Sequence, residues 1–152
     1  MHKVIHPEDP TWVLIRRLGY AGLIPFVFLA LCLWVVGEDL HPYVALSMQA
    51  WGGVVVSFLG GIHWGVGFHN ALTQQQAPRL HLVWGIVPTI LAWVAVMMPA
   101  FAGLPLLGFV LIGCYMVDRQ TWPDAGLAPW LPMRWRLTVV SALSCFLAAG
   151  AT

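Results

Sequence analysis

The chain has 152 residues, of which 60% are hydrophobic and only 9% are charged. A soluble domain carries roughly 25% charged residues, so this composition excludes a water-soluble globular protein and predicts one integral-membrane domain over residues 1–152. The formal net charge of +1 gives no reason to expect nucleic-acid binding.

Five apolar runs follow one another along the chain and predict an all-α membrane protein, a bundle of five transmembrane helices, because a span needs about 20 mostly apolar residues. The runs cover residues 18–37, 43–68, 80–98, 101–117 and 136–150, and the last is the shortest. The first run ends in Trp34–Gly37 without the small-x-small pattern of a cleavage site. We therefore expect it to be a retained membrane helix, not a cleaved signal peptide.

Two connecting segments have compositions that disfavour a helix. The stretch 73–79 is polar and predicts a loop between the second and third spans. The stretch 121–132 contains three prolines and two tryptophans and predicts an irregular segment that lies against the lipid headgroups.

All basic residues fall on one side of this predicted topology. They are Lys3, Arg16, Arg17, Arg79, Arg119, Arg134 and Arg136, whereas the opposite loops hold only Glu38 and Asp39. The positive-inside rule then predicts a cytoplasmic N-terminus and a periplasmic C-terminus. No Arg- and Ser-rich transit peptide precedes the first run, which favours the bacterial inner membrane, with the lipid bilayer as the first partner.

The run 43–68 carries the clearest helical pattern. On a helical wheel at about 100° per residue, one face collects small and polar residues and the other collects bulky apolar ones. The small and polar face comprises Gln49, Gly52, Gly53, Val56, Gly60, His63 and Gly67. Small residues let helix backbones approach closely, so we expect this helix at the bundle centre. Its expected packing residues are Gly53, Ser57, Gly60, Gly61 and Gly65.

His63 lies on the inward face of this run, close to the predicted cytoplasmic surface. An ionisable residue inside a membrane is a functional-site hypothesis by default. The alternative is a neutral histidine that hydrogen-bonds a carbonyl or hydroxyl group of a neighbouring helix. Both interpretations stay open.

The predicted orientation brings other polar and aromatic residues to the depth of His63, which defines a candidate site for a lipophilic small molecule such as a quinone, lipid or porphyrin. Its expected members are His63, Trp64, Tyr20, Trp84, Tyr115, Asp118, Arg119 and Arg136. A basic rim would suit an anionic or carbonyl head group, and aromatic walls would suit a flat ring. The alternative is an aromatic belt whose arginines reach toward the headgroups.

The sequence leaves the cofactor unknown, and haem is a possible but disfavoured one. Haem ligation needs two histidines at one depth, and we expect His69 and His81 at the membrane interface and not within a span. No pair of histidines or carboxylates stands at helical spacing on one inward face, so no metal site is predicted. The three cysteines form no CxxC pair and predict neither a disulfide framework nor a zinc site.

Several short strings resemble the family that contains transmembrane protein 69, a group of small proteobacterial membrane proteins with mitochondrial relatives and a domain of unknown function. The strings are Tyr20–Phe26, Ser57–Gly65, Trp84–Pro88, Asp118–Arg119, Pro129–Trp130 and Met133–Thr138. The part Gly60–Gly65 is the most specific, and Leu131–Pro132 departs from the aromatic residue expected there. The resemblance implies five inner-membrane helices and no established activity. It also points to His63, Trp64, Asp118 and Arg134 or Arg136.

Three functions remain open, and a non-enzymatic role is favoured for all of them. The first is binding of a lipophilic molecule near His63. The second is an accessory or assembly subunit of a larger membrane complex, including a complex with itself, formed through the glycine-rich face of 43–68. The third is proton or solute conduction with His63 and Asp118 as relay groups.

Overall fold

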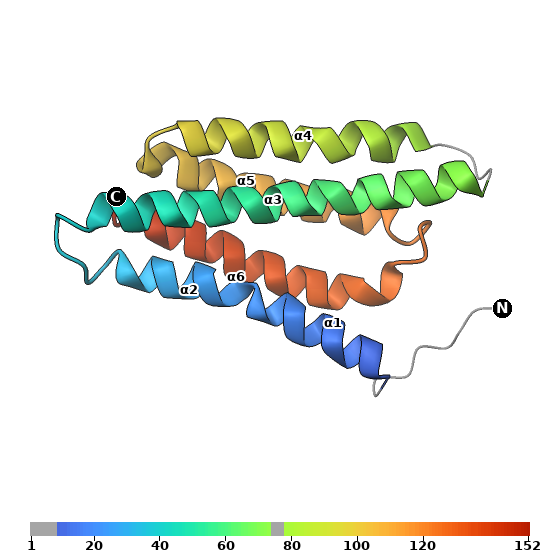
Figure 1. Cartoon of the computed structure of the whole chain (residues 1–152), viewed down its shortest axis with the longest axis horizontal. Coiled ribbons are helices and arrows are strands. Elements are labelled where there is room, and N and C mark those ends of the chain that lie inside the picture. Colours follow the sequence, from blue (N-terminus) through green and yellow to red (C-terminus); the bar gives the residue numbers. More distant parts are fainter. Residues whose placement is uncertain (1–8, 74–77) are drawn as a thin grey trace.

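The computed structural model describes residues 9–73 and 78–152, and Figure 1 shows them as a helical bundle. The helices are α1 (Pro10–Ala21), α2 (Leu23–Cys32), α3 (His41–Leu72), α4 (Pro78–Met97), α5 (Ala100–Thr121) and α6 (Leu131–Ala149), with a short 3-10 turn η1 (Ala128–Trp130) before α6. No strand occurs in these ranges, which confirms the predicted all-α fold. Lys3 and the middle of the predicted loop 73–79 lie outside the described residues.

Four helical segments are long and apolar enough to cross a membrane, namely residues 10–32, 41–72, 79–97 and 100–121. They correspond to the first four predicted spans. α6 is less apolar and does not belong to this set within the described chain. Four of its polar residues nevertheless lie on one buried face, namely Arg134, Thr138, Ser141 and Ser144. Arg136, near the start of the helix, and Leu143 and Leu147 on the outer face are exposed.

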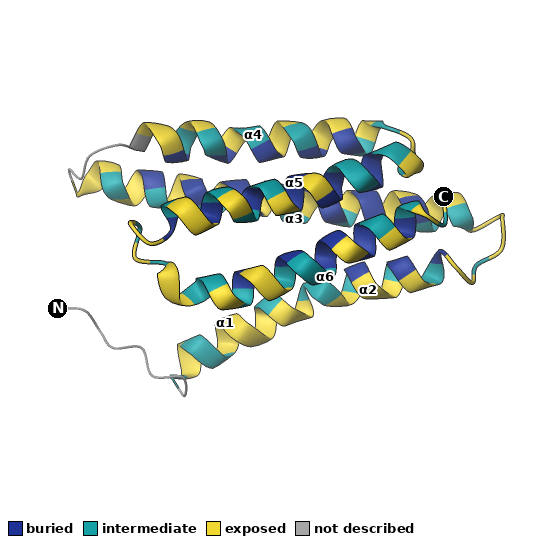
Figure 2. Cartoon of the chain, turned by 180° about the vertical axis from the view of Figure 1, so that it is seen from behind, coloured by how far each residue is buried: buried dark blue, intermediate teal, exposed yellow. Residues whose placement is uncertain are grey.

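The helices lie side by side and alternate in direction (Figure 1). α1, α4 and α6 begin at the same end of the bundle at which α3 and α5 finish. This end therefore carries the described basic residues, whereas Glu38 and Asp39 lie in the connection between α2 and α3 at the other end. Buried positions face inward and exposed positions face outward along each helix, and α1 is the most exposed helix (Figure 2).

The first helical segment starts at Pro10 and not at Leu18 as predicted. Proline is favoured in a first helical turn because its missing N–H would have no partner there. The Asp9 side chain caps the helix by accepting a hydrogen bond from the Thr11 backbone N–H at 2.8 Å. The predicted boundary was wrong because Arg16 was treated as lying outside the helix, although a membrane helix can continue through its basic flank.

The same segment is interrupted at Gly22, which separates α1 from α2. Pro25 follows three residues later and cannot donate a backbone hydrogen bond to the preceding turn. The indole N–H of Trp51 donates to the carbonyl of Gly22 at 3.2 Å. This bond ties the break in the first segment to α3.

The last helix also starts earlier than predicted, at Leu131 and not at Arg136. Pro132 lies in its first turn, the position where proline is tolerated. The predicted irregular segment 121–132 therefore shrinks to a turn, η1 and the first residues of α6. The rings of Trp12 and Trp130 lie 3.8 Å apart, which joins α1 to η1.

The inward face predicted for α3 is confirmed. All seven of its small and polar members are buried. The expected packing set is correct for Gly53 and Gly60, and Ser57 is half-buried. It is wrong for Gly61 and Gly65, which are exposed and would meet no described neighbour if they carried a Cβ.

Gln49 fixes the end of α3 that lies far from the basic residues. Its side-chain amide donates to the carbonyls of Ala95 at 2.9 Å and Met98 at 3.0 Å, where α4 ends. Carbonyls in the last turn of a helix lack the usual partner within the helix, and here only the Met98 N–H reaches the Ala95 carbonyl, at 3.3 Å, among the described backbone groups. Gln49 therefore supplies hydrogen bonds that water cannot provide inside a bilayer.

Candidate functional site

A chain of hydrogen-bonded polar side chains crosses the interior of the bundle near its basic end. It comprises His81 from α4, His63 from α3, Asp118 from α5, and Arg134 and Thr138 from α6. We call these five residues the buried network. Each is less than one-tenth exposed, and Asp118 is only 1% exposed. Four helices thus contribute to one polar cluster in an apolar core.

Short distances connect the network from end to end. The Nδ1 atoms of His63 and His81 lie 2.9 Å apart, and Nε2 of His63 lies 2.9 Å from Oδ1 of Asp118. Nε of Arg134 donates to Oδ2 of Asp118 at 2.7 Å, and its Nη1 donates to the Thr138 hydroxyl. Both carboxylate oxygens accept hydrogen bonds, as expected for an ionised Asp118 beside a permanently charged guanidinium.

Two glycines bring the histidines together. A Cβ at Gly60 would overlap the carbonyl oxygen of Gly85, so α3 and α4 approach at backbone distance there. Gly60 precedes His63 by about one turn, and Gly85 follows His81 by about one turn. The indole of Trp64 seals the contact by donating to the carbonyl of Leu82 at 3.0 Å.

His81 lies in the first turn of α4, near the predicted membrane interface, but its side chain is directed into the bundle and not toward the outside. Its side chain is only 8% exposed and pairs with His63. The sequence predicted that the third span begins at residue 80, next to His81. In the structure α4 begins at Pro78, and His81 faces α3 from the first turn of α4. A polar residue near a helix end stays inside the bundle when a neighbouring helix offers it a partner.

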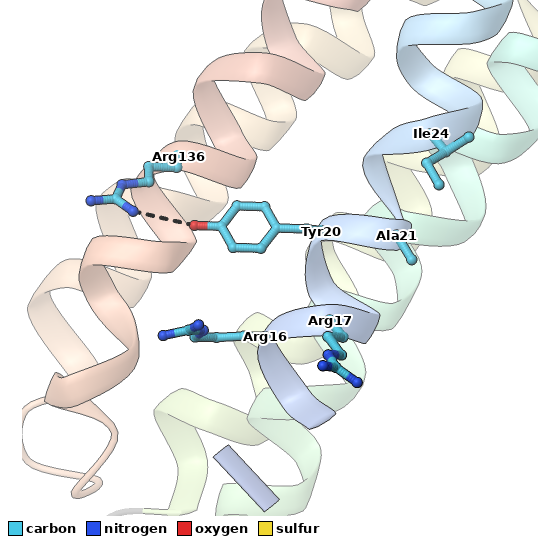
Figure 3. A pocket seen from close by; sticks show the side chains of 6 residues that line it. All are labelled: Arg16, Arg17, Tyr20, Ala21, Ile24 and Arg136. Carbon is cyan, nitrogen blue, oxygen red and sulfur yellow. Dashed lines mark hydrogen bonds between the residues drawn. The ribbon is translucent and has the colours of Figure 1, made fainter. Parts of the chain in front are cut away.

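The predicted ligand site divides into separate groups. His63 and Asp118 belong to the buried network, whereas Tyr20 and Arg136 line a different pocket on the outer side of α1 and α6. This pocket has a volume of about 640 Å³ and also includes Arg16, Arg17, Ala21 and Ile24. Arg136 donates to the Tyr20 hydroxyl at 3.4 Å, and Arg16 extends toward the same side (Figure 3).

The remaining predicted site residues are members of neither group, although Trp64 packs at the α3–α4 contact beside the histidines. Trp64 is about one-third exposed, and Arg119 is exposed. Tyr115 is half-buried and its ring packs against Trp135 with centroids 5.1 Å apart. The buried Nε1 of Trp84 has no hydrogen-bond partner among the described residues. The eight predicted residues therefore do not come together in one site.

Two apolar clefts adjoin the buried network between α1–α2, α3 and α6. Their volumes are about 340 and 480 Å³. They share Leu18, Gly19, Phe58, Leu59, Arg134 and Leu137, so they form neighbouring parts of one groove. Leu18 and Phe58 are largely exposed, which opens the groove to the outer surface of the bundle.

Arg134 is the charged residue that lines both clefts. Its Nη2 is buried and has no hydrogen-bond acceptor among the described residues, and the same holds for Nε1 of Trp122 in the larger cleft. Buried donors in native proteins are almost always paired. Two residues that line the groove, Arg134 and Trp122, therefore each carry a buried N–H group without a partner among the described residues.

The histidine pair does not fit haem ligation. Axial ligands lie on opposite sides of an iron, whereas these two Nδ1 atoms hydrogen-bond each other. The described residues also contain no group of three or more His, Cys, Asp or Glu side chains that could hold a metal ion. The hydrogen bonds of the network are suited to holding charge and to holding or moving a proton.

The network residues that the sequence prediction missed were His81 and Thr138, while Arg134 entered only through the resemblance. A signal for α6 was available, because Arg134, Thr138 and Ser141 recur at helical spacing on one face. A similar signal existed for α4, because His81, Gly85, Pro88, Ala92 and Ala95 recur at helical spacing and all are buried.

The fold and the network together define a polytopic α-helical membrane protein with a buried charge and imidazole cluster. The chain matches the family described as protein of unknown function DUF3429 over residues 13–150, and it belongs to that family. It is also 39% identical over 80 residues to transmembrane protein 69 of Xenopus tropicalis, which confirms the resemblance. That match covers 53% of this chain and 31% of the relative's length. No solved structure matches the chain.

Proposed function

We propose that this chain is a single inner-membrane domain of a bacterium, with five spans, a cytoplasmic N-terminus and a periplasmic C-terminus. The collection of described basic residues at one end of the bundle supports this orientation. α6 serves as the fifth span because Arg134, Thr138, Ser141 and Ser144 face the bundle and the exposed Leu143 and Leu147 are apolar, while the exposed Arg136 lies near the cytoplasmic start of the helix. Its 19 residues match the length that a span requires.

The function that the geometry supports best is non-enzymatic binding of an amphipathic small molecule, a lipid or a quinone-like compound, in the groove next to Arg134. The observation that carries this proposal is the buried Nη2 of Arg134, an unpartnered charged donor in a residue that lines both apolar clefts. An oxygen-rich head group would accept from Nη2. The tail would lie along the apolar walls and leave through the open side near Leu18 and Phe58.

This proposal moves the binding site from His63 to Arg134, which is joined to His63 through Asp118. Neither cleft is lined by His63, which contacts the groove only through Asp118 and Arg134. His63 then holds Asp118, and Asp118 holds the guanidinium in place. The head group meets Arg134, and Trp122 supplies a second donor in the larger cleft.

A pair of glycine substitutions tests the binding proposal. Gly19 lies between the two clefts, and a Cβ there would already lie 3.3 Å from Cε of Met133. Gly19→Leu should therefore fill the groove with side chain. Gly61→Leu is the matched control, because it adds the same group where no described atom lies within 4 Å of a Cβ.

The measurement is mass spectrometry of the lipids and other amphiphiles that copurify with each variant from native membranes. We expect one class of molecule to be retained by the wild type and by Gly61→Leu and to be depleted in Gly19→Leu. The same bound species in equal amounts in all three proteins would contradict the proposal.

A further inference from the structure

The contact between the two imidazoles restricts where protons can sit. Nε2 of His63 faces a carboxylate oxygen and must carry a hydrogen to donate to it. If His63 is neutral, its Nδ1 is then a bare acceptor, and Nδ1 of His81 must donate to it. This leaves Nε2 of His81 without a hydrogen. One further proton can therefore enter the pair only at Nε2 of His81 or in the shared contact.

The charges around the pair balance in the absence of a ligand. Asp118 carries one negative charge, Arg134 carries one positive charge, and the two histidines are neutral. Among the described residues, the buried thiol of Cys114, one turn before Asp118 on α5, is a further titratable group close to Asp118 and Arg134. The basic residues next in sequence, Arg79 on α4 and Arg119 on α5, are exposed.

An anionic head group at Nη2 of Arg134 would disturb this balance. Arg134 would then be shared between two anions inside an apolar bundle, where an uncompensated charge is costly. A second cation beside Asp118 restores neutrality. A protonated His63 can be this second cation, because its Nε2 lies 2.9 Å from Oδ1 of Asp118.

We infer that the groove takes an anionic amphiphile and that its binding is coupled to the uptake of one proton by the His63–His81 pair. This inference rests on the proposed function. In the bound state His63 is an imidazolium that donates through Nε2 to Asp118 and through Nδ1 to His81. His81 then carries its hydrogen on Nε2. The proton comes from water, and no covalent bond other than N–H changes.

The path for that proton follows the same geometry. Nε2 of His81 makes no hydrogen bond to any residue of the described ranges. His81 lies in the first turn of α4, two residues from the exposed Arg79, at the basic end of the bundle. A proton can therefore reach the pair from that end. Gln49, the next buried polar side chain of α3, lies about 21 Å farther along the helix at 1.5 Å per residue, so the network ends inside the bundle.

Because proton uptake and ligand binding are thermodynamically linked, the coupling can be measured as the slope of the dissociation constant against pH. If one proton is taken up on binding, the dissociation constant rises by up to about tenfold for each unit rise in pH. The probe must keep its own charge, so we choose ω-bromoundecanesulfonate, an alkyl sulfonate that stays ionised. Its bromine quenches tryptophan fluorescence, and Trp122 and Trp130 line the larger cleft. The neutral ω-bromoundecanol serves as the matched probe.

Binding is measured in maltoside micelles at a fixed ratio of probe to detergent, between about pH 5 and pH 8, where imidazole titrates. The part of the fluorescence quenching that reports binding in the groove is the saturable part, which Gly19→Leu should remove and Gly61→Leu should keep. We expect the wild type to bind the sulfonate more weakly as the pH rises and the alcohol with no pH dependence. In His63→Gln the amide still donates to Asp118 but cannot accept a proton. The slope should then fall to less than about twofold per pH unit, and His81→Gln should flatten it as well.

Failure of the inference and failure of the proposed function give different results. Saturable binding without a pH slope, or with a slope that His63→Gln and His81→Gln leave unchanged, overturns the coupling and leaves the groove as a binding site. Quenching that Gly19→Leu does not reduce overturns the groove itself and the coupling with it.

Discussion

His63 and His81 lie 18 positions apart in the sequence, yet their Nδ1 atoms are 2.9 Å apart and their rings stack with centroids separated by 5.1 Å. Each imidazole supplies the hydrogen-bond partner that the other would otherwise obtain from water. Inside a bilayer no water replaces a missing partner. The pair therefore stabilises the contact between α3 and α4 in addition to any role in proton uptake.

Removal of one member of the Asp118–Arg134 pair should destabilise the protein strongly. Both side chains are buried, and breaking such a pair leaves an unpaired charge that costs about 3–5 kcal/mol. We expect Asp118→Leu to lower the free energy of unfolding by that order. The double variant Asp118→Leu with Arg134→Met should lose less, because it buries no isolated charge. Unfolding in mixed micelles, followed by helical circular dichroism, measures both; a double variant less stable than the single one would show that the pair is not mutually compensating.

Backbone contact between α3 and α4 predicts opposite outcomes for two adjacent glycines. A methyl group at Gly60 would overlap the carbonyl oxygen of Gly85, which belongs to the backbone and cannot rotate away. Gly60→Ala should therefore force the helices apart and weaken the His63–His81 contact. Gly61→Ala meets no described atom and should be neutral or stabilising, since alanine favours a helix by about 1 kcal/mol over glycine. Thermal unfolding of the two variants side by side checks this, and equal melting temperatures would contradict the close approach.

These two glycines also show what the sequence could predict. The inward face of α3 follows from the helical repeat, a local property, and every residue assigned to it is buried. The series Gly53, Ser57, Gly61, Gly65 was wrongly extended, because a step of four residues turns about 40° beyond a full circle at 100° per residue. After three steps the series has left the inward face. Its end is therefore exposed.

The buried network was harder to predict for a physical reason. A single sequence reports the phase of each helix about its own axis but not which helix stands opposite. His63 and Asp118 could be placed at one depth from the predicted topology, and the structure joins them directly. His81 was left out of the site because it stands at the start of its apolar run, and its pairing with His63 of α3 could not be read from that position. Arg134 looked like a flanking charge, although its guanidinium turns inward to Asp118.

Gln49 should contribute to stability at the opposite end of the bundle. It donates to the carbonyls of Ala95 and Met98, and Gln49→Leu would leave both without that bond. An unsatisfied buried polar group costs about 1–3 kcal/mol, so the free energy of unfolding should fall by about that amount. Ser47→Ala is the control, because the Ser47 hydroxyl bonds only the carbonyl of Tyr43 within its own helix. A Gln49→Leu variant as stable as Ser47→Ala would mean that these bonds contribute nothing.

The proposed topology makes a prediction that depends on α6 more than on any other helix. Alkaline phosphatase is active only outside the cytoplasm, so its fusions report the side on which a residue lies. Fusions after Gly37 and after Thr152 should be active, and a fusion after Gly126, in the turn between α5 and η1, should be inactive. The physical reason is that arginines such as Arg119 and Arg136 are retained on the cytoplasmic side, while the exposed apolar positions of α6 favour its insertion. Fluorescent-protein fusions at the same three sites should give the reverse pattern. If the fusions after Gly126 and Thr152 report the same side, α6 does not cross the membrane, and the Arg134 groove then lies at the surface of the bilayer and not within it.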